Sequence, residues 1–195
     1  MQLRTLATAL ALVLGVTPAA WASSLPKVDF GPSPSFGFGL GANQLWQTGG
    51  SLSLDVPVTD SILIGGSAAT NFDGSVNFDV RGLYRLIEGG TEGPTIAAMI
   101  GLWSAPGAAN GANFQLPYPV APLVGFGLAY PVMDKVDLRL NLAYSPFFTY
   151  TGEFLTFIGG PPSSGVEVGY QLTPTMEVTL GINGRGDFLG ANLTF

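Results

Sequence analysis

Alternation of polar and apolar residues at a period of two is the feature that most limits how this chain can fold. Ten segments of about eight to twelve residues show it, and almost no pattern at the helical period is present. Alternation gives each strand one apolar and one more polar face. The sequence therefore predicts an all-β fold of ten antiparallel strands, near residues 36–45, 49–57, 61–71, 75–86, 94–103, 120–131, 135–144, 163–172, 175–183 and 188–195.

The composition indicates that the apolar faces need apolar surroundings. Hydrophobic residues make up 47% of the chain and charged residues only 10%, whereas charged residues reach about 25% in ordinary soluble domains. Beyond the N-terminus, no run of roughly 18 apolar residues could cross a membrane as a helix. Strands are therefore the elements expected to meet lipid.

The N-terminal residues have the pattern of a cleaved export signal. Arg4 precedes an apolar run from Leu6 to Val16, and Ala20-Trp21-Ala22 follows as a cleavage site. We therefore expect residues 1–22 to be a signal peptide, residues 23–35 a periplasmic N-terminal segment, and residues 36–195 the folded domain. The absence of cysteine excludes a lipidated N-terminus, disulfides and thiolate metal sites.

The connections between strands alternate between two kinds. Tight connections follow every second strand, at 57–61, 87–93, 132–134 and 173–174, whereas 104–119 and 145–162 are long. Short turns at one rim and longer loops at the other are typical of bacterial outer-membrane barrels. The last strand carries its apolar residues at alternate positions, namely Leu189, Ala191, Leu193 and Phe195.

With these features the chain resembles the small bacterial outer-membrane β-barrel proteins of the OmpA, OmpX and OmpW type. The resemblance implies a transmembrane, up-and-down β-barrel in the outer membrane, with both termini on the periplasmic side. It also implies that the barrel-assembly machinery recognises the C-terminal strand. Barrels of eight strands are common among such proteins, so eight strands remain an alternative to ten. A soluble secreted β-sandwich is the alternative outside this family.

Aromatic residues are expected to form a girdle at the periplasmic rim. Tyr84, Tyr130 and Tyr170 each lie just before a short turn, and Phe195 falls at the same depth on the last strand. Amphipathic aromatic rings favour the headgroup level of a bilayer. In a soluble protein the same tyrosines would belong to the core.

The inward faces are expected to collect charges of both signs. In a ten-strand barrel, strand n lies opposite strand n+5, which places Asp55 opposite Arg139 and Arg85 opposite Glu177. Arginine is long enough to reach a carboxylate across a narrow lumen. We expect these pairs to close the lumen, either as a permanent polar core or as a gate. The predicted lumen charge network comprises Asp55, Asp79, Arg81, Arg85, Asp137, Arg139, Glu167 and Glu177.

Two other regions bear on passage through the barrel. The inward residues Gly37, Gly39 and Gly41 are expected to oppose Gly125, Gly127 and Ala129, which signals either a channel or curvature of the sheet. The loop at 146–162 is unusually apolar, which predicts either an entry for hydrophobic solutes or a packed extension of the flanking strands. Its aromatic residues are Phe147, Phe148, Tyr150, Phe154 and Phe157.

These observations favour a narrow or gated passive diffusion channel, with the outer-membrane lipid bilayer and small solutes as partners. The alternatives are a closed structural or loop-displaying barrel and a conduit for small hydrophobic solutes. Histidine and cysteine are absent, so we expect no enzyme activity, no metal site and no cofactor. The chain after residue 22 has six Lys or Arg against 13 Asp or Glu, which does not suit nucleic acid.

Overall fold

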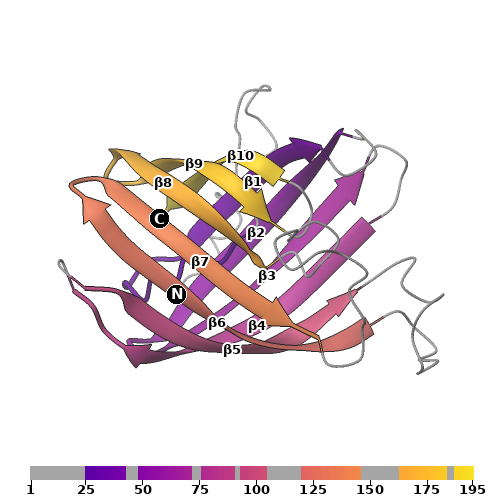
Figure 1. Cartoon of the computed structure of the whole chain (residues 1–195), viewed down its shortest axis with the longest axis horizontal. Coiled ribbons are helices and arrows are strands. Elements are labelled where there is room, and N and C mark those ends of the chain that lie inside the picture. The colour runs from indigo at the N-terminus through magenta and orange to yellow at the C-terminus, as the bar shows by residue number, and fades with distance from the viewer. Residues whose placement is uncertain are drawn as a thin grey trace.

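Ten antiparallel strands form a closed barrel in the computed structural model, which describes residues 25–42, 48–71, 76–90, 93–104, 120–145, 163–183 and 187–195. Each strand pairs with its neighbours in sequence, and β1 pairs with β10 to close the sheet (Figure 1). The strands are β1 (Ser35–Ala42), β2 (Thr48–Thr59), β3 (Ile62–Asn71), β4 (Val76–Ile87), β5 (Thr95–Ser104), β6 (Val120–Met133), β7 (Val136–Tyr144), β8 (Gly165–Thr173), β9 (Met176–Asn183) and β10 (Asp187–Thr194).

The predicted all-β fold and the count of ten strands are confirmed, and the boundaries differ by only a few residues. An eight-strand barrel and a β-sandwich are both wrong for this chain. No helix is present in the described ranges, so none there is long and apolar enough to cross a membrane.

The tight connections lie together at one end of the barrel, which we call the short-turn end (Figure 1). In an antiparallel barrel every even-numbered strand ends where the next odd-numbered strand begins, so β2–β3, β4–β5, β6–β7 and β8–β9 all turn at this end. The start of β1 lies there too, and the backbone N–H of Phe195 donates to the carbonyl of Pro34 at 3.0 Å.

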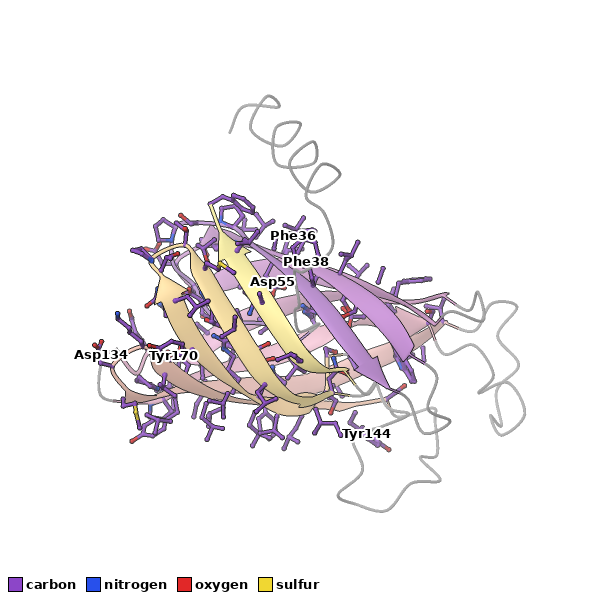
Figure 2. All side chains as sticks on the ribbon, turned by 90° about the horizontal axis from the view of Figure 1, so that it is seen from above. Phe36, Phe38, Asp55, Asp134, Tyr144 and Tyr170 are labelled. Atoms are coloured by element: carbon purple, nitrogen blue, oxygen red, sulfur yellow. The ribbon has the colours of Figure 1, made fainter. Side chains whose placement is uncertain are left out.

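Alternation along the strands separates an apolar outside from a mixed inside. On β4, Phe78, Val80 and Tyr84 are exposed, whereas Asp79, Arg81 and Leu83 are buried. Figure 2 shows the same outward direction for Tyr170, near the short-turn end, and for Tyr144, near the other end. Exposed large apolar side chains include Leu52, Leu54, Ile64, Val80, Ile100, Leu102, Val124, Phe126, Leu142, Val168 and Leu180.

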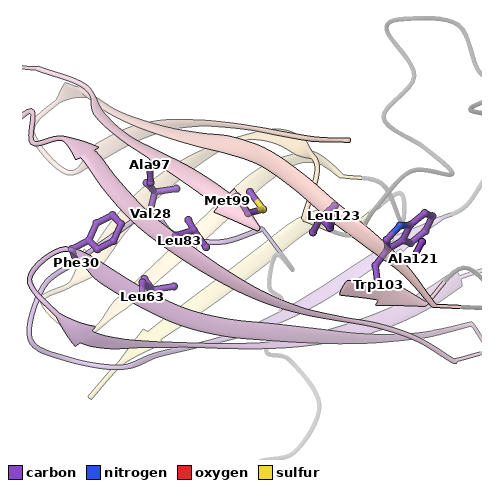
Figure 3. Packing of buried hydrophobic residues seen from close by; sticks show 9 residues of the cluster. All are labelled: Val28, Phe30, Leu63, Leu83, Ala97, Met99, Trp103, Ala121 and Leu123. Carbon is purple, nitrogen blue, oxygen red and sulfur yellow. The ribbon is translucent and has the colours of Figure 1, made fainter. Parts of the chain in front are cut away.

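The lumen has one predominantly apolar wall. Its side chains come from neighbouring strands β3 to β6 and follow the barrel lengthwise, with Trp103 and Ala121 towards one end (Figure 3). We call this set the apolar wall: Leu63, Leu83, Ala97, Met99, Trp103, Ala121 and Leu123.

Residues 25–34, which we call the inserted segment, enter the lumen next to this wall: Leu25, Pro26, Val28 and Phe30 are buried, whereas Asp29 and Pro32 are exposed. Val28 and Phe30 belong to the same buried cluster as the apolar wall (Figure 3). The carbonyl of Pro26 accepts a hydrogen bond of 3.1 Å from Asn141 Nδ2 on β7, and the N–H of Lys27 lies 3.4 Å from Asp55 Oδ2 on β2. The segment therefore contacts strands on different sides of the barrel.

The sequence predicts residues 23–35 to be a periplasmic segment that precedes the barrel. The periplasmic location of the segment stays a prediction. Of the described part, Leu25, Pro26, Val28 and Phe30 are buried in the lumen, and β1 begins at Ser35. The reason is space: a Cβ added at Gly127 would lie 2.8 Å from Val28 Cγ2, so the missing side chain on β6 leaves room that Val28 fills. Gly37 and Gly39 are likewise buried.

Burial of the inserted segment predicts that a thiol placed in it reacts slowly. The chain has no cysteine of its own. We expect a Val28→Cys variant, refolded in detergent, to react with a water-soluble thiol reagent more than about tenfold more slowly than a Thr175→Cys control, because reaction requires local opening. Thr175 is exposed in the β8–β9 turn. Equal rates in the folded protein would contradict the position of the segment; in urea the two rates should converge.

Candidate functional site

The first charge cluster of the lumen is built around Arg81 on β4. Its Nη1 lies 2.8 Å from Asp79 Oδ1, and its Nη2 lies 3.0 Å from Asp55 Oδ1. Ser67 Oγ on β3 donates to Asp79 Oδ2 at 2.9 Å. We call these four residues the Arg81 cluster. One guanidinium group thus bridges two carboxylates, in the planar fork geometry that arginine favours.

The strand register explains why Asp55 and Arg81 meet. Asp55 pairs with Gly65 across β2 and β3, and Gly65 pairs with Arg81 across β3 and β4. A Cβ at Gly65 would collide with the carboxylate of Asp55 and would lie 2.9 Å from the carbonyl oxygen of Leu54. Because the middle position lacks a side chain, the carboxylate and the guanidinium group meet over it.

The second cluster is built around Arg139 on β7 and repeats this design. Nη1 of Arg139 lies 2.8 Å from Glu167 Oε1 on β8, and Nη2 lies 2.6 Å from Glu177 Oε2 on β9. Asn192 Nδ2 on β10 donates to Glu177 Oε1 at 3.1 Å. We call these four residues the Arg139 cluster. A Cβ at Gly169 would lie 2.6 Å from Glu177 Oε1 and 3.1 Å from Arg139 Nη2, so a glycine again makes the contact possible.

Burial makes these ion pairs obligatory. Arg81 and Arg139 are each 1% exposed, and Asp55, Asp79, Glu167 and Glu177 are also buried. A charge removed from water is stable only when it is paired and hydrogen-bonded. Each cluster contains two carboxylates and one guanidinium group, and therefore carries a formal charge of −1 when all three are ionised.

Lys27 of the inserted segment supplies a positive charge between the clusters. Its Nζ lies 3.8 Å from Glu177 Oε2, 3.4 Å from Thr194 Oγ1 and 3.4 Å from Asp29 Oδ2. Its side chain is 14% exposed, and its backbone N–H reaches Asp55. Lys27 thus contacts the Arg139 cluster with its ammonium group and the Arg81 cluster with its backbone.

Lys27 is not among the site residues predicted from the sequence. Lys27 and Asp29 alternate with Val28 and Phe30, which is the same period-two signal that identified the strands. The signal extends over too few residues to define a strand, and it precedes the first predicted one. Counting this short alternation as part of the barrel interior would have identified it.

The predicted pairs across the lumen are wrong. Asp55 pairs with Arg81 rather than Arg139, and Glu177 pairs with Arg139 rather than Arg85. The inserted segment enters the lumen, and each arginine reaches carboxylates of nearby strands over a glycine, so the observed ion pairs run along the barrel wall instead of across the lumen.

Two of the eight predicted lumen charges lie nearer the solvent at the short-turn end. Arg85 pairs with the exposed Glu88 at 3.3 Å and lies 5.6 Å above the ring of Phe30. Asp137 lies 3.6 Å from Arg139 and is half exposed. The other six form the buried clusters described above.

The four residues of the predicted girdle all point outward. Tyr84, Tyr130, Tyr170 and Phe195 are exposed near the short-turn end, so their assignment to a protein core is wrong. Their contact with lipid headgroups stays a prediction. The five aromatic residues of the apolar loop, Phe147, Phe148, Tyr150, Phe154 and Phe157, lie outside the described residues.

Removal of Arg139 should destabilise the barrel strongly. We expect Arg139→Met to lower the free energy of unfolding by about 3–5 kcal/mol, because it leaves two buried carboxylates without their guanidinium partner. The measurement is the urea unfolding midpoint of the refolded protein. Adding Glu167→Gln and Glu177→Gln to this variant should recover much of the loss, since the unpaired charges are then gone.

Arg85→Met is the matched control, because Arg85 pairs with a carboxylate that is 68% exposed. Exposed ion pairs contribute about 1 kcal/mol or less. Similar losses in the Arg85 and Arg139 variants would contradict the role given to the buried cluster.

The chain matches no protein-family model and no curated protein. The closed ten-strand barrel is a property of the structure itself, while membership of an outer-membrane family remains a prediction from the sequence pattern. Function therefore has to be inferred from the outer surface of the barrel and from the contents of its lumen.

Proposed function

We propose that this chain is exported by its N-terminal signal peptide and becomes an integral outer-membrane β-barrel. In that membrane it acts as a narrow, gated passive diffusion channel whose resting state is closed. The observation that carries this proposal is that the barrel has charged side chains inside and apolar side chains outside, which is the reverse of a soluble protein. Paired charges are buried inside, as in the Arg81 and Arg139 clusters, whereas leucine, isoleucine, valine and phenylalanine side chains are exposed outside.

The membrane location is supported by the arrangement of the exposed side chains. In water, an apolar outer surface spread over many strands would drive association, and large exposed apolar patches mark interaction with lipid or protein. A closed barrel leaves no strand edge unpaired, which is the condition for crossing a bilayer with strands. The exposed tyrosines near the short-turn end suit the interface between hydrocarbon and water.

Gating is supported by the nature of the closure. The inserted segment is not a strand of the barrel, and it is held by side-chain packing, the Pro26–Asn141 hydrogen bond and the contacts of Lys27. Such contacts are individually weak, so the segment can leave without disturbing the strand pairing. Its departure would open the space between the apolar wall on β3–β6 and the Arg139 cluster on β7–β10.

A closed structural barrel is the second candidate function. The observation that favours it is the nearly complete burial of Arg81 and Arg139, because barrels of about eight strands are filled by their own side chains. Ten strands enclose more space than eight, and here the inserted segment takes up part of it. Conductance after removal of that segment distinguishes the two functions.

The membrane location predicts that charge on the outer face is costly in a depth-dependent way. Ile100 lies midway along β5 and is 68% exposed, whereas Met133 is 64% exposed at the short-turn end of β6. In lipid vesicles, Ile100→Arg should lower the free energy of unfolding by about 2–4 kcal/mol and Met133→Arg by about 1 kcal/mol or less. Urea titration of the vesicle-embedded protein measures both. If the two variants matched the unsubstituted chain, the outer face would not be meeting hydrocarbon.

The gated channel predicts that removal of the inserted segment creates conductance. A chain that starts at Ser23 should be silent for most of the recording in a planar bilayer. A chain that starts at Pro34 should give discrete conductance steps, because residues 23–33, which include the part buried in the lumen, are absent. A difference in electrophoretic migration between unheated and heated samples must first show that both chains are folded.

A synthetic peptide of residues 23–33 provides the matched control. Added to the shortened chain, it should block the current, whereas a peptide of scrambled sequence should not. A folded shortened chain that stays silent would contradict the channel and leave the closed structural barrel.

A further inference from the structure

The inserted segment has two faces that match the two sides of the lumen. Val28 and Phe30 pack with the apolar wall (Figure 3). Lys27 and Asp29, at the alternate positions, form an ion pair of 3.4 Å. Lys27 also reaches Glu177 and Thr194. The lumen thus holds an ammonium group with apolar groups close beside it in the same short peptide.

The charges that remain without the segment favour a cation in this place. The Arg81 and Arg139 clusters each contain one carboxylate in excess of their guanidinium group. Withdrawal of the segment takes away both Lys27 and Asp29, so the two clusters leave two excess negative charges facing the lumen when all four carboxylates are ionised. A cleft lined by one sign of charge concentrates ions of the opposite sign.

The contacts of Lys27 fit an ammonium group better than a metal ion. Its Nζ has one carboxylate and one hydroxyl of the barrel within 4 Å, from Glu177 and Thr194. Divalent cations such as Ca²⁺ need six or more oxygen ligands. Within the described part of the chain, no three acidic side chains converge as a metal site. A compact ammonium group with three donors needs fewer partners.

We propose that the lumen contains a binding site for a primary alkylammonium cation, formed by Glu177 and Thr194 across the lumen from the apolar wall, and that Lys27 occupies it in place of a solute. The preferred solute combines a positively charged amine with an apolar body, as the inserted segment does. The passage of such a solute rests on the proposed channel, but the existence of the site does not.

Chemical rescue tests the site itself. Lys27→Ala removes a fragment equivalent to propylammonium and should lower the urea unfolding midpoint of the refolded barrel. Propylammonium chloride should restore at least half of that shift, and it should leave the unsubstituted chain unchanged. Potassium chloride and sodium propionate at the same ionic strength should have no such effect, because neither supplies an ammonium group on an apolar stem.

Two variants test whether propylammonium binds at Glu177. In Lys27→Ala combined with Glu177→Gln the effect of propylammonium should disappear, since the carboxylate that receives the ammonium group is neutral. Lys135 lies in the exposed β6–β7 turn. In the Lys135→Ala variant, propylammonium should leave the urea unfolding midpoint unchanged at every concentration. If Lys27→Ala does not refold, propylammonium present during refolding should restore the yield of folded barrel. Rescue that potassium chloride reproduces, or the absence of any rescue, overturns the proposal.

Ion selectivity of the shortened chain tests passage. In a gradient of potassium chloride, the chain that starts at Pro34 should prefer K⁺ over Cl⁻ by about tenfold, and hexylammonium should block the current at lower concentrations than hexanoate. If propylammonium rescues Lys27→Ala but the shortened chain gives no conductance, the binding site is supported and the channel is rejected. Conductance without cation preference and without rescue would retain the channel and reject the site.

Discussion

The hydrogen-bonded pairing of β1 with β10 closes the sheet and divides every strand into an inner and an outer face. Once the sheet is closed, polar groups on inward positions cannot reach bulk water by moving to an edge, and in the described part of the chain no second layer covers the apolar groups on outward positions. The buried charge clusters and the exposed apolar surface both follow from this closure.

Charges enclosed in the lumen need partners of opposite sign, and the positions of glycine residues determine which ion pairs have room to form. Asp55 meets Arg81 over Gly65, and Arg139 meets Glu177 over Gly169. A side chain at either glycine would occupy the place where the ion pair forms. The small residues of the lumen therefore make room for salt bridges along the wall, in addition to the room that Gly127 gives to Val28.

The sequence was most informative where one local rule was sufficient. Period-two alternation predicted the strands, the outward tyrosines and the inward position of residues such as Asp79 and Glu167, because the direction of a side chain on a strand depends only on its position. It was least informative about contacts. Strand number alone predicts that Asp55 faces Arg139, because strand number takes no account of the missing side chain at Gly65 or of the peptide in the lumen.

The sequence by itself determined an all-β chain of ten strands with charges on one face and apolar residues on the other, because these properties depend only on the spacing of residues along the chain. Only the tertiary structure decided that Val28 and Phe30 are buried inside the barrel, that each buried arginine bridges two carboxylates on its own side, and that Lys27 joins the two clusters. The physical reason is that these contacts depend on the volume left inside the closed barrel, which no local pattern specifies.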